Sequence, residues 1–345
     1  MPLPLLGIVI EDRYNDHLQH ILGAMFAARR SGWNVLIHNN PAILANMGVS
    51  ALYYTRYDMM GIDRVAEMHA SGIPVLLGAV SHEGLPDIGI DHIHGHRIIA
   101  AFLKRRSIKK VAYAKGPAGH SHADERLLCF QQAMSREGFQ TADYHVYQAA
   151  FDIEPSVEST VETLIAHPDV GAVVCCNDAC ATGVLLAIKR LGLDQFKDVM
   201  VIGYGNSKAM ADISPYPFIT VNTPLIKVGV DGFHALKRAH ENNTILSDNI
   251  RIRPSFNSRN IEHGDPAHER FEWDCVDEYD GLLVDLINLL GPLGPRYGRA
   301  LMRHFRLRIV KGMPLIENFE HFLIRGMYYG LNPLAAMTIL TDLDR

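Results

Sequence analysis

Short apolar runs alternate with amphipathic stretches through the first two hundred or so residues. The runs are continuously apolar, as in strands of a parallel sheet that is buried on both faces. The stretches between them repeat apolar residues at intervals of three and four, which predicts helices, and Gly32 and Gly72 follow two of them as stop signals. Predicted strands cover 5–11, 34–39, 51–55, 73–79 and 109–116, and predicted helices cover 16–31, 62–71 and 93–106.

The same rhythm begins again after residue 116. Helices are predicted at 122–137, 156–167 and 179–191, and strands at 143–148, 170–178 and 199–205. Two series of alternating strands and helices, similar in size, indicate an α/β fold with two doubly wound parallel-sheet lobes.

Composition is that of a globular protein and limits the partners to expect. The chain has 345 residues, 48% apolar and 21% charged, enough for one large core or two to three smaller ones. A formal net charge of -5 gives no global attraction to nucleic acid or membranes. The N-terminal sequence lacks the basic region of a signal peptide, and no run reaches the roughly 18 apolar residues of a membrane span. We therefore expect a cytoplasmic protein without membrane contact.

Three of the five cysteines fall in the short stretch VVCCNDAC. An odd number of cysteines without a repeating spacing favours reduced thiols over a disulfide framework. Successive strand residues point to opposite faces, so Cys175 and Cys176 are expected apart, and Cys180 lies on the following helix. This argues against a structural zinc site and predicts that the cysteines are buried packing residues.

The pair Asn177 and Asp178 stands where a predicted strand meets a helix N-terminus. In open α/β sheets ligands bind at this end of the strands, and polar side chains here also cap helices. For Asp178, capping and contact with a ligand are both open interpretations at this point.

Five motifs between residues 89 and 239 stand in the order and spacing of one known family. They are GIDHIHGHRIIAAFLKRRSIKKVAYAKGP, DERLLCFQQAMSREGF, NDACATGVLLAIKRLGL, DVMVIGYGNSKAMADISPYPFITVNTP and VGVDGFHALKRA. Together they resemble the effector-binding half of the lactose/galactose-repressor (LacI/GalR) family, over about residues 5–262. The resemblance implies a type I periplasmic-binding-protein-like core whose chain crosses between lobes near residues 116, 223 and 243. It assigns 1–116 and 224–243 to the N-terminal lobe, and 117–223 and 244–262 to the C-terminal lobe.

The resemblance also implies a cleft between the lobes that binds a sugar-like or purine-like small molecule. It places Arg126 there as a donor fork and Asn177 as an amide that both donates and accepts, two groups suited to polyols. Where sugar-binding members have acidic residues, this chain has Gly205 followed by Asn206, and His94. The expected ligand-binding residues are Arg126, Asn177, His94, His120, Asn206 and Thr223.

Histidine is frequent in the same region. His92, His94 and His96 lie in DHIHGHR, and His120 and His122 lie in GHSHADER. Imidazoles in place of carboxylates favour an anionic or heteroaromatic ligand over a neutral hexose. A metal site is the alternative, because histidines at alternate positions of an extended segment share a face. The helix expected to begin within DHIHGHR argues against it, so we predict neither a metal nor a cofactor.

The two ends of the chain depart from the family. The N-terminal helix-turn-helix that reads the major groove in family repressors is expected to be absent. Residues 265–345 are predicted to form a separate all-α module after a polar linker. Its helices are predicted at 276–291, 296–312, 314–330 and 332–344.

The predicted helix 296–312 carries a basic stripe. Leu301, Phe305 and Ile309 share one face, and the opposite face carries Arg296, Arg299, Arg303 and Arg306. Such arginines are able to track phosphates or to meet an acidic partner. The alternative is a solvated face that is balanced by acidic residues of the preceding helix.

Two function hypotheses follow, and neither is enzymatic. The chain shows no nucleophile elbow, Walker or dinucleotide-binding motif, so we expect no enzyme. The first hypothesis is a small-molecule-sensing transcriptional regulator, a homodimer or higher homo-oligomer, that contacts DNA through its C-terminal module. The second is a ligand sensor whose C-terminal helices bind a protein partner or form an oligomer without DNA contact.

Overall fold

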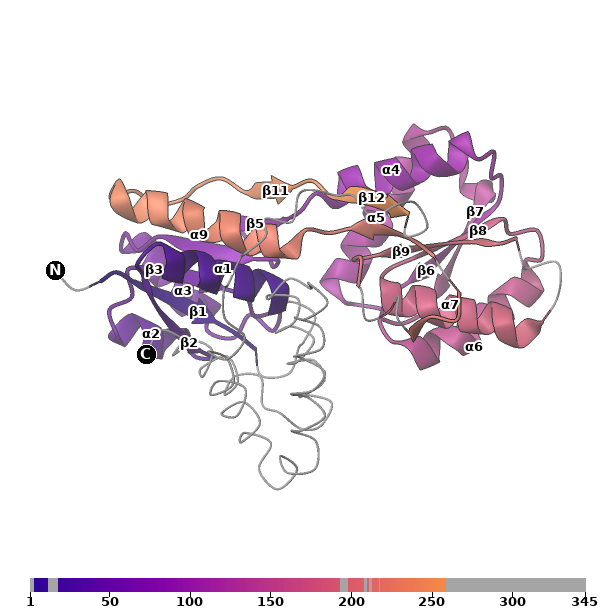
Figure 1. Cartoon of the computed structure of the whole chain (residues 1–345). Helices are drawn as coiled ribbons and strands as arrows, with labels where there is room; N and C mark the ends of the chain where they lie inside the picture. Colours follow the sequence, from indigo (N-terminus) through magenta and orange to yellow (C-terminus); the bar gives the residue numbers. More distant parts are fainter. Residues whose placement is uncertain are drawn as a thin grey trace, which may run out of the picture. The chain divides into compact units, whose positions relative to one another are not determined.

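The chain divides into two compact units, each built around one sheet (Figure 1). The computed structural model describes residues 3–11, 18–192, 198–207, 210, 213–216 and 218–258. Unit 1 takes its described residues from Met1–Gly89 and Leu225–Ile252, and unit 2 takes its own from Ile90–Pro224 and Arg253–Asp265. The predicted α/β class with two doubly wound sheets is confirmed.

Unit 1 is a six-stranded sheet with helices on both faces. Its strand order is β11-β5-β4-β3-β1-β2, and neighbours among β1 to β5 pair in parallel. The strands are β1 (Leu5–Val9), β2 (Asn34–His38), β3 (Ala51–Tyr54), β4 (Val75–Gly78), β5 (Asp87–Ile90) and β11 (Ile250–Ile252). The helices are α1 (Leu18–Arg30), α2 (Pro41–Asn46), α3 (Ile62–Ala70) and α9 (Leu225–Glu241).

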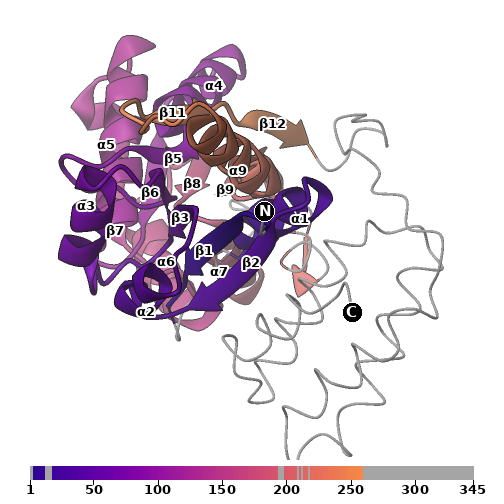
Figure 2. The ribbon, with the colours of Figure 1, turned by 90° about the vertical axis from the view of Figure 1, so that its left-hand side faces the viewer.

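Alternation along the strands sends apolar side chains to both faces of this sheet. Tyr54 joins Val9 and Leu52 in a core beneath α2 and α3. Its neighbour Tyr53 lies on the opposite face, against Gly232 of α9. Figure 2 shows α1 and α9 on one side of the sheet, and α2 and α3 on the other. Burial on both faces explains why the strand sequences are unbroken apolar runs.

Helices α1 and α9 pack closely because glycines lie at their contact. A side chain on Gly23 would overlap the carbonyl oxygen of Ile226, and one on Gly229 would overlap the carbonyl oxygen of His20. With no Cβ at either position, the two backbones can touch.

Unit 2 repeats the architecture with a second six-stranded sheet. Its order is β12-β10-β9-β8-β6-β7, parallel except for β12, which runs antiparallel to β10. The strands are β6 (Val111–Lys115), β7 (Tyr144–Gln148), β8 (Ala172–Cys175), β9 (Met200–Tyr204), β10 (Ile219–Asn222) and β12 (Ser255–Ser258). The helical elements are α4 (His92–Arg105), α5 (Ser121–Arg136), the 3-10 turn η1 (Thr141–Asp143), α6 (Ile153–Ala166) and α7 (Asp178–Leu191).

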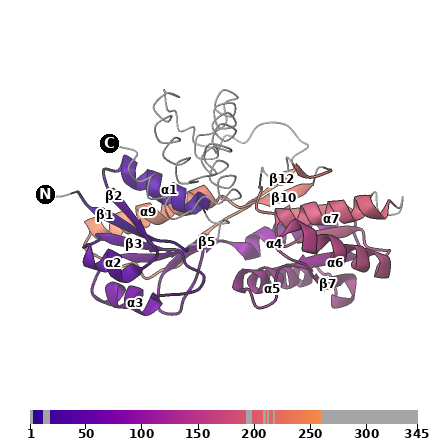
Figure 3. The same ribbon diagram turned by 90° about the horizontal axis from the view of Figure 1, so that it is seen from below.

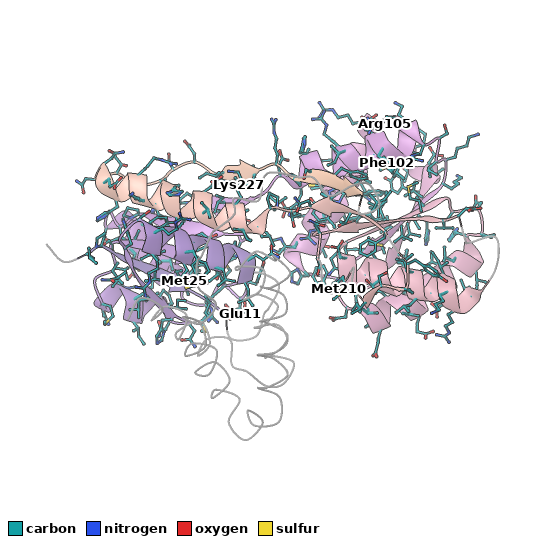
Figure 4. All side chains as sticks on the ribbon, viewed as in Figure 1. Glu11, Met25, Phe102, Arg105, Met210 and Lys227 are labelled. Atoms are coloured by element: carbon teal, nitrogen blue, oxygen red, sulfur yellow. The ribbon has the colours of Figure 1, made fainter. Side chains whose placement is uncertain are left out.

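The two faces of this sheet are covered by different helix pairs. Val111 and Tyr113 pack beneath α4 and α5, whereas Ala112 and Ala114 pack beneath α6 and α7. Figure 3 shows α6 and α7 side by side within this unit. Figure 4 labels Phe102 on α4, whose ring centroid lies 4.8 Å from that of Phe256 on β12. This ring contact attaches the antiparallel edge strand to a helix.

The division between the units differs from the predicted one. The chain passes from one unit to the other at residues 89/90, 224/225 and 252/253, whereas the crossings were predicted near residues 116, 223 and 243. The first prediction is wrong by a whole helix and strand, since 93–116 lies in unit 2 and not in the N-terminal lobe. The reason is pairing: β6 hydrogen-bonds to β7 and β8, and α4 packs on α5.

The predicted C-terminal module lies outside the described residues. This holds for all of 265–345, including Arg296, Arg299, Arg303 and Arg306. Among the helices that the structure does describe, each is too short or too polar to cross a membrane.

The helix contact in unit 1 gives a stability prediction. Replacing Gly229 by Ala should lower the free energy of unfolding by about 1–3 kcal/mol, because the added methyl forces α1 and α9 apart. Gly89→Ala is the matched control, since nothing lies within 4 Å of a Cβ at that position and its φ is not positive. Urea denaturation of both variants measures the difference, and equal midpoints would show that the glycine contact is not required.

Candidate functional site at the carboxyl edge of the unit 2 sheet

The carboxyl ends of the parallel strands of unit 2 meet at one edge of the sheet, and polar residues gather there. Strands β6, β8, β9 and β10 end at Lys115, Cys175, Tyr204 and Asn222. Helices α5 and α7 begin directly after two of these strands, and α4 begins beside Tyr204. Open α/β sheets bind ligands at this edge. All six predicted ligand-binding residues lie in unit 2.

Tyr204 is the centre of this arrangement. It is buried, and its hydroxyl oxygen lies 2.8 Å from His92 Nδ1. Its ring stacks on that of His96, with centroids 5.1 Å apart and planes 18° from parallel. A Cβ on Gly95 would clash with the hydroxyl, which explains the glycine within DHIHGHR. Burial holds the pKa of Tyr204 well above its usual value, so the phenol is neutral at ordinary pH.

Arg126 lies over this ring and is fixed by two contacts. Its guanidinium carbon is 5.0 Å from the centroid of the Tyr204 ring, within the range of a cation–π interaction. Its Nη1 donates to the carbonyl oxygen of Cys176 at 2.7 Å. Its Nε is buried and has no hydrogen-bond partner among the described residues. The structure therefore holds a positioned arginine with donor capacity to spare at the sheet edge.

The neighbouring histidines are kept neutral. Burial lowers the pKa of His96 to about 4, so its ring is uncharged at pH 7, and its Nδ1 lies 2.8 Å from the carbonyl oxygen of His92. Burial, with smaller contributions from His122 and Arg126, also lowers the pKa of His120. The His120 ring meets that of Phe151 edge-on, at 4.9 Å between centroids. Neutral imidazoles both donate and accept hydrogen bonds, as ligand recognition requires.

The segment DHIHGHR is helical from His92 onward. His92, His94 and His96 therefore do not form the extended row considered as a metal site. Asp91 caps the helix by accepting from the backbone N–H of His94 at 2.9 Å, and the side chain of His94 is half-buried. The fold brings His92 close to His122 instead, at 6.5 Å between ring centroids.

Asn177 and Asp178 have separate structural tasks. Asn177 is the N-cap of α7: its Oδ1 accepts from the backbone N–H of Cys180 at 2.7 Å, and its Nδ2 donates to the carbonyl oxygen of Phe151 at 2.9 Å. Asp178 is buried and accepts from the hydroxyl of Thr220 at 2.6 Å and from the backbone N–H of Ser207. The capping interpretation thus holds for Asn177 and not for Asp178.

Asn206 lies in the loop after β9, next to Ser207, and Thr223 directly follows β10, the strand that holds Thr220. Asn206 has a left-handed backbone (φ 59°), donates from its backbone N–H to Thr220 Oγ1 at 3.2 Å, and donates from Nδ2 to Asn222 Oδ1 at 3.2 Å. Thr223 is buried, and its hydroxyl donates to the carbonyl oxygen of Gly205 at 3.3 Å. Both residues therefore belong to the rim of the same sheet edge as Arg126.

The cysteines of VVCCNDAC are buried free thiols, as predicted. One detail was wrong: β8 ends at Cys175, so strand alternation does not reach Cys176, and the Cys180 thiol hydrogen-bonds to both. Burial raises the pKa of Cys175. Hydrogen bonding among the thiols, together with burial, raises the pKa of Cys176 and Cys180. Protonated thiols are poor nucleophiles and poor metal ligands.

Two important residues were not predicted from the sequence. Tyr204 looked like the last apolar residue of a strand, and its position directly before Gly205 was the available signal. Glu125 was also not singled out. It lies three residues after His122 on one helix, a spacing that places Glu125 and His122 on the same face.

Comparison with known proteins agrees with this fold. Residues 99–259 match the family model of the periplasmic binding protein-like domain. The ribose import binding protein RbsB of Escherichia coli (strain K12) is 31% identical over 198 residues, which are 53% of this chain and 65% of that protein. The HTH-type transcriptional repressor PurR of Histophilus somni (strain 129Pt) is 30% identical over 148 residues, 43% of this chain and 44% of that protein.

A solved structure gives the same architecture. The lac repressor dimer bound to operator and the anti-inducer ONPF is similar with a TM-score of 0.62 and 19% identity, over 74% of this chain and 92% of that one. At this identity the likeness establishes the fold and not the ligand. The chain spans only 44% to 65% of the length of the two curated relatives.

Residues 99–259 are therefore similar to the periplasmic binding protein-like domain. The predicted resemblance to the effector-binding part of LacI/GalR regulators is confirmed by the repressor relative and by the fold.

The buried carboxylate of Asp178 gives the second stability prediction. Asp178→Ala should lower the free energy of unfolding by about 2–4 kcal/mol, because the buried hydroxyl of Thr220 and the half-buried backbone N–H of Ser207 lose their acceptor. Asp198→Ala is the control, an exposed aspartate in the same unit. Chemical denaturation compares them, and a cost below about 0.5 kcal/mol for Asp178→Ala would contradict the bridging role.

Proposed function

We propose that this protein is a ligand-sensing transcriptional regulator that binds a sugar-like, anionic or heteroaromatic small molecule at the carboxyl edge of the unit 2 sheet. The observation that carries the proposal is the set of contacts made by Arg126. Its guanidinium is fixed by Tyr204 and the Cys176 carbonyl, while its buried Nε finds no partner within the described part of the chain. A polar ligand is the group that would complete its hydrogen bonding.

The surrounding side chains support a ligand that offers acceptors. Both oxygens of the Asp178 carboxylate already accept hydrogen bonds within the protein, from Thr220 and Ser207. Besides Arg126, the proposed binding groups are the amides of Asn177 and Asn206, the hydroxyl of Thr223 and the imidazoles of His94 and His120. Sugar hydroxyls, a carboxylate, a phosphate or a ring nitrogen each provide the acceptors that such a set recognises.

The names of the relatives support both halves of the proposal. One is a ribose import binding protein, and the other is a transcriptional repressor. We extend the repressor's role to this chain as a cytoplasmic homodimer. Its output would run through residues 265–345, where the stripe Arg296, Arg299, Arg303 and Arg306 supplies phosphate-binding charge.

The binding half is tested with Arg126→Ala. A thermal-shift panel of ribose, ribose 5-phosphate, gluconate and hypoxanthine first identifies a ligand that raises the melting temperature. Arg126→Ala should then weaken that ligand by about 1.5–3 kcal/mol in calorimetry, because the ligand loses charged hydrogen bonds. Arg136→Ala, an exposed arginine in the last turn of α5, should bind as the unmodified protein does. Equal affinity of all three proteins would remove Arg126 from the site.

The regulatory half is tested by DNA binding. A mobility-shift assay with the full chain and promoter fragments, at low and moderate salt, should show complexes that weaken steeply as salt rises. The triple change Arg299→Gln, Arg303→Gln and Arg306→Gln should abolish them and leave ligand affinity unchanged. Complexes that persist in the triple variant would show that these arginines do not contact DNA. Absence of any complex would favour the second hypothesis, a sensor that acts through a protein partner.

A further inference from the structure

His92, His122 and Glu125 come together where the first turns of α4 and α5 meet. His92 is the first residue of α4, and the other two lie three residues apart in the first turn and a half of α5. One candidate ligand atom from each residue lies within 4.8 Å of the other two. His122 Nδ1 and Glu125 Oε2 are 3.8 Å apart. The trio thus links two helices that are neighbours in unit 2.

We propose that His92, His122 and Glu125 bind one divalent transition-metal ion, with Zn²⁺ the best match to the donor set. Two imidazole nitrogens and one carboxylate oxygen are the ligands of open zinc sites, which keep a further position for water or another ligand. Tetrahedral bonds of about 2.0–2.1 Å place ligand atoms roughly 3.3 Å apart, so the trio needs an inward movement of about 1 Å. The exposed Glu125 and the half-buried His122 are able to make it.

The surroundings of His92 are those of a metal-bound histidine. Its Nδ1 lies 2.8 Å from the hydroxyl oxygen of Tyr204. In the tautomer that carries its proton on Nδ1, the ring donates to that oxygen and presents Nε2 to the metal. A ligand histidine usually donates its other ring nitrogen in this way, which fixes the tautomer and the ring orientation. Tyr204 is in turn held by the His96 ring. Tyr204 is therefore a positioning residue for the proposed site.

Some charged groups near the trio disfavour a bound cation, and others favour it. The N-termini of two helices and the guanidinium of Arg126 disfavour positive charge, but Arg126 is directed to the Cys176 carbonyl and the Tyr204 ring. Glu125 supplies a negative charge, and the nearby Lys115 is paired with Asp124 at 2.7 Å. Metal–ligand bonds are much stronger than a helix-dipole effect, so the donor set decides.

The inference does not rest on the proposed function, because metal alone is the probe. The tag-free full chain would be titrated with Co²⁺, whose absorption reports the coordination geometry, and Zn²⁺ affinity would follow from competition. We expect one Co²⁺ per chain with visible ligand-field bands, displaced by one Zn²⁺. Binding should weaken as the pH falls, because protons compete with the metal for the imidazole nitrogens.

The metal affinities of single variants show whether the ion binds at this site or at other histidines. His92→Gln, His122→Gln and Glu125→Gln should each weaken the ion by about tenfold or more, and Tyr204→Phe, which keeps the ring but removes the hydroxyl, by about tenfold. His145→Gln is the control, an exposed histidine of β7 in the same unit, and should bind as the unmodified chain does. Circular dichroism checks that each variant is folded.

Two results would overturn the proposal. One is the absence of Co²⁺ bands at neutral pH in the unmodified chain. The other is equal metal affinity in folded His122→Gln and in the unmodified chain, which would place any bound metal elsewhere. Failure of this site would leave the ligand test on Arg126 unaffected, since Arg126 is not a proposed metal ligand.

Discussion

The burial of the Tyr204 ring at the end of β9 is the constraint on which the candidate site depends. The ring lies between the imidazole of His96 and the guanidinium of Arg126, and the hydroxyl lies beside His92. Burying an aromatic side chain stabilises the fold by about 1.5–3 kcal/mol, and a cation–π contact adds about 0.5–2 kcal/mol. One strand-end residue thereby fixes side chains from two helices, and Gly95 makes room for it.

A second buried group, the Asp178 carboxylate, holds the rim of the same edge. Its bonds to Thr220 and Ser207 tie α7 to strand β10 and to the loop after β9, next to Asn206 and Thr223. Because this carboxylate serves the fold, it is not free to receive a ligand's hydroxyls. Fixed positive charge from Arg126 and neutral imidazoles remain, which is why an acceptor-bearing ligand suits the site better than a pure donor.

Much of the fold could be predicted from the sequence. Long runs with a clear period, such as β1, α1, α4 and α7, fall within a few residues of their predicted bounds because apolar spacing follows burial directly. Two short elements were missed: α2, with six residues, is too short to show a helical period, and an aspartate and a glycine interrupt the apolar run of β5, DIGI. The first crossing was misplaced because the apolar spacing predicts a helix and a strand in 93–116 but does not show which sheet that strand joins.

The site was predictable only in part. Arg126 and the five other expected residues were named from the family resemblance, and the fold places all six in unit 2. The different roles of Asn177 and Asp178 depend on Thr220 and Phe151, which are distant in sequence. The same is true of the contact between His92 and Tyr204, 112 residues apart. Such pairings are decided by tertiary packing and cannot be predicted from local sequence patterns.

Hydrogen–deuterium exchange with and without a stabilising ligand tests the central claim, that the carboxyl edge of the unit 2 sheet is the binding site. The account predicts slower exchange in four segments when ligand is bound. They follow β6, β8, β9 and β10, at residues 116–126, 175–180, 204–207 and 222–224. Unchanged exchange in these segments, with protection confined to other parts of the chain, would contradict it.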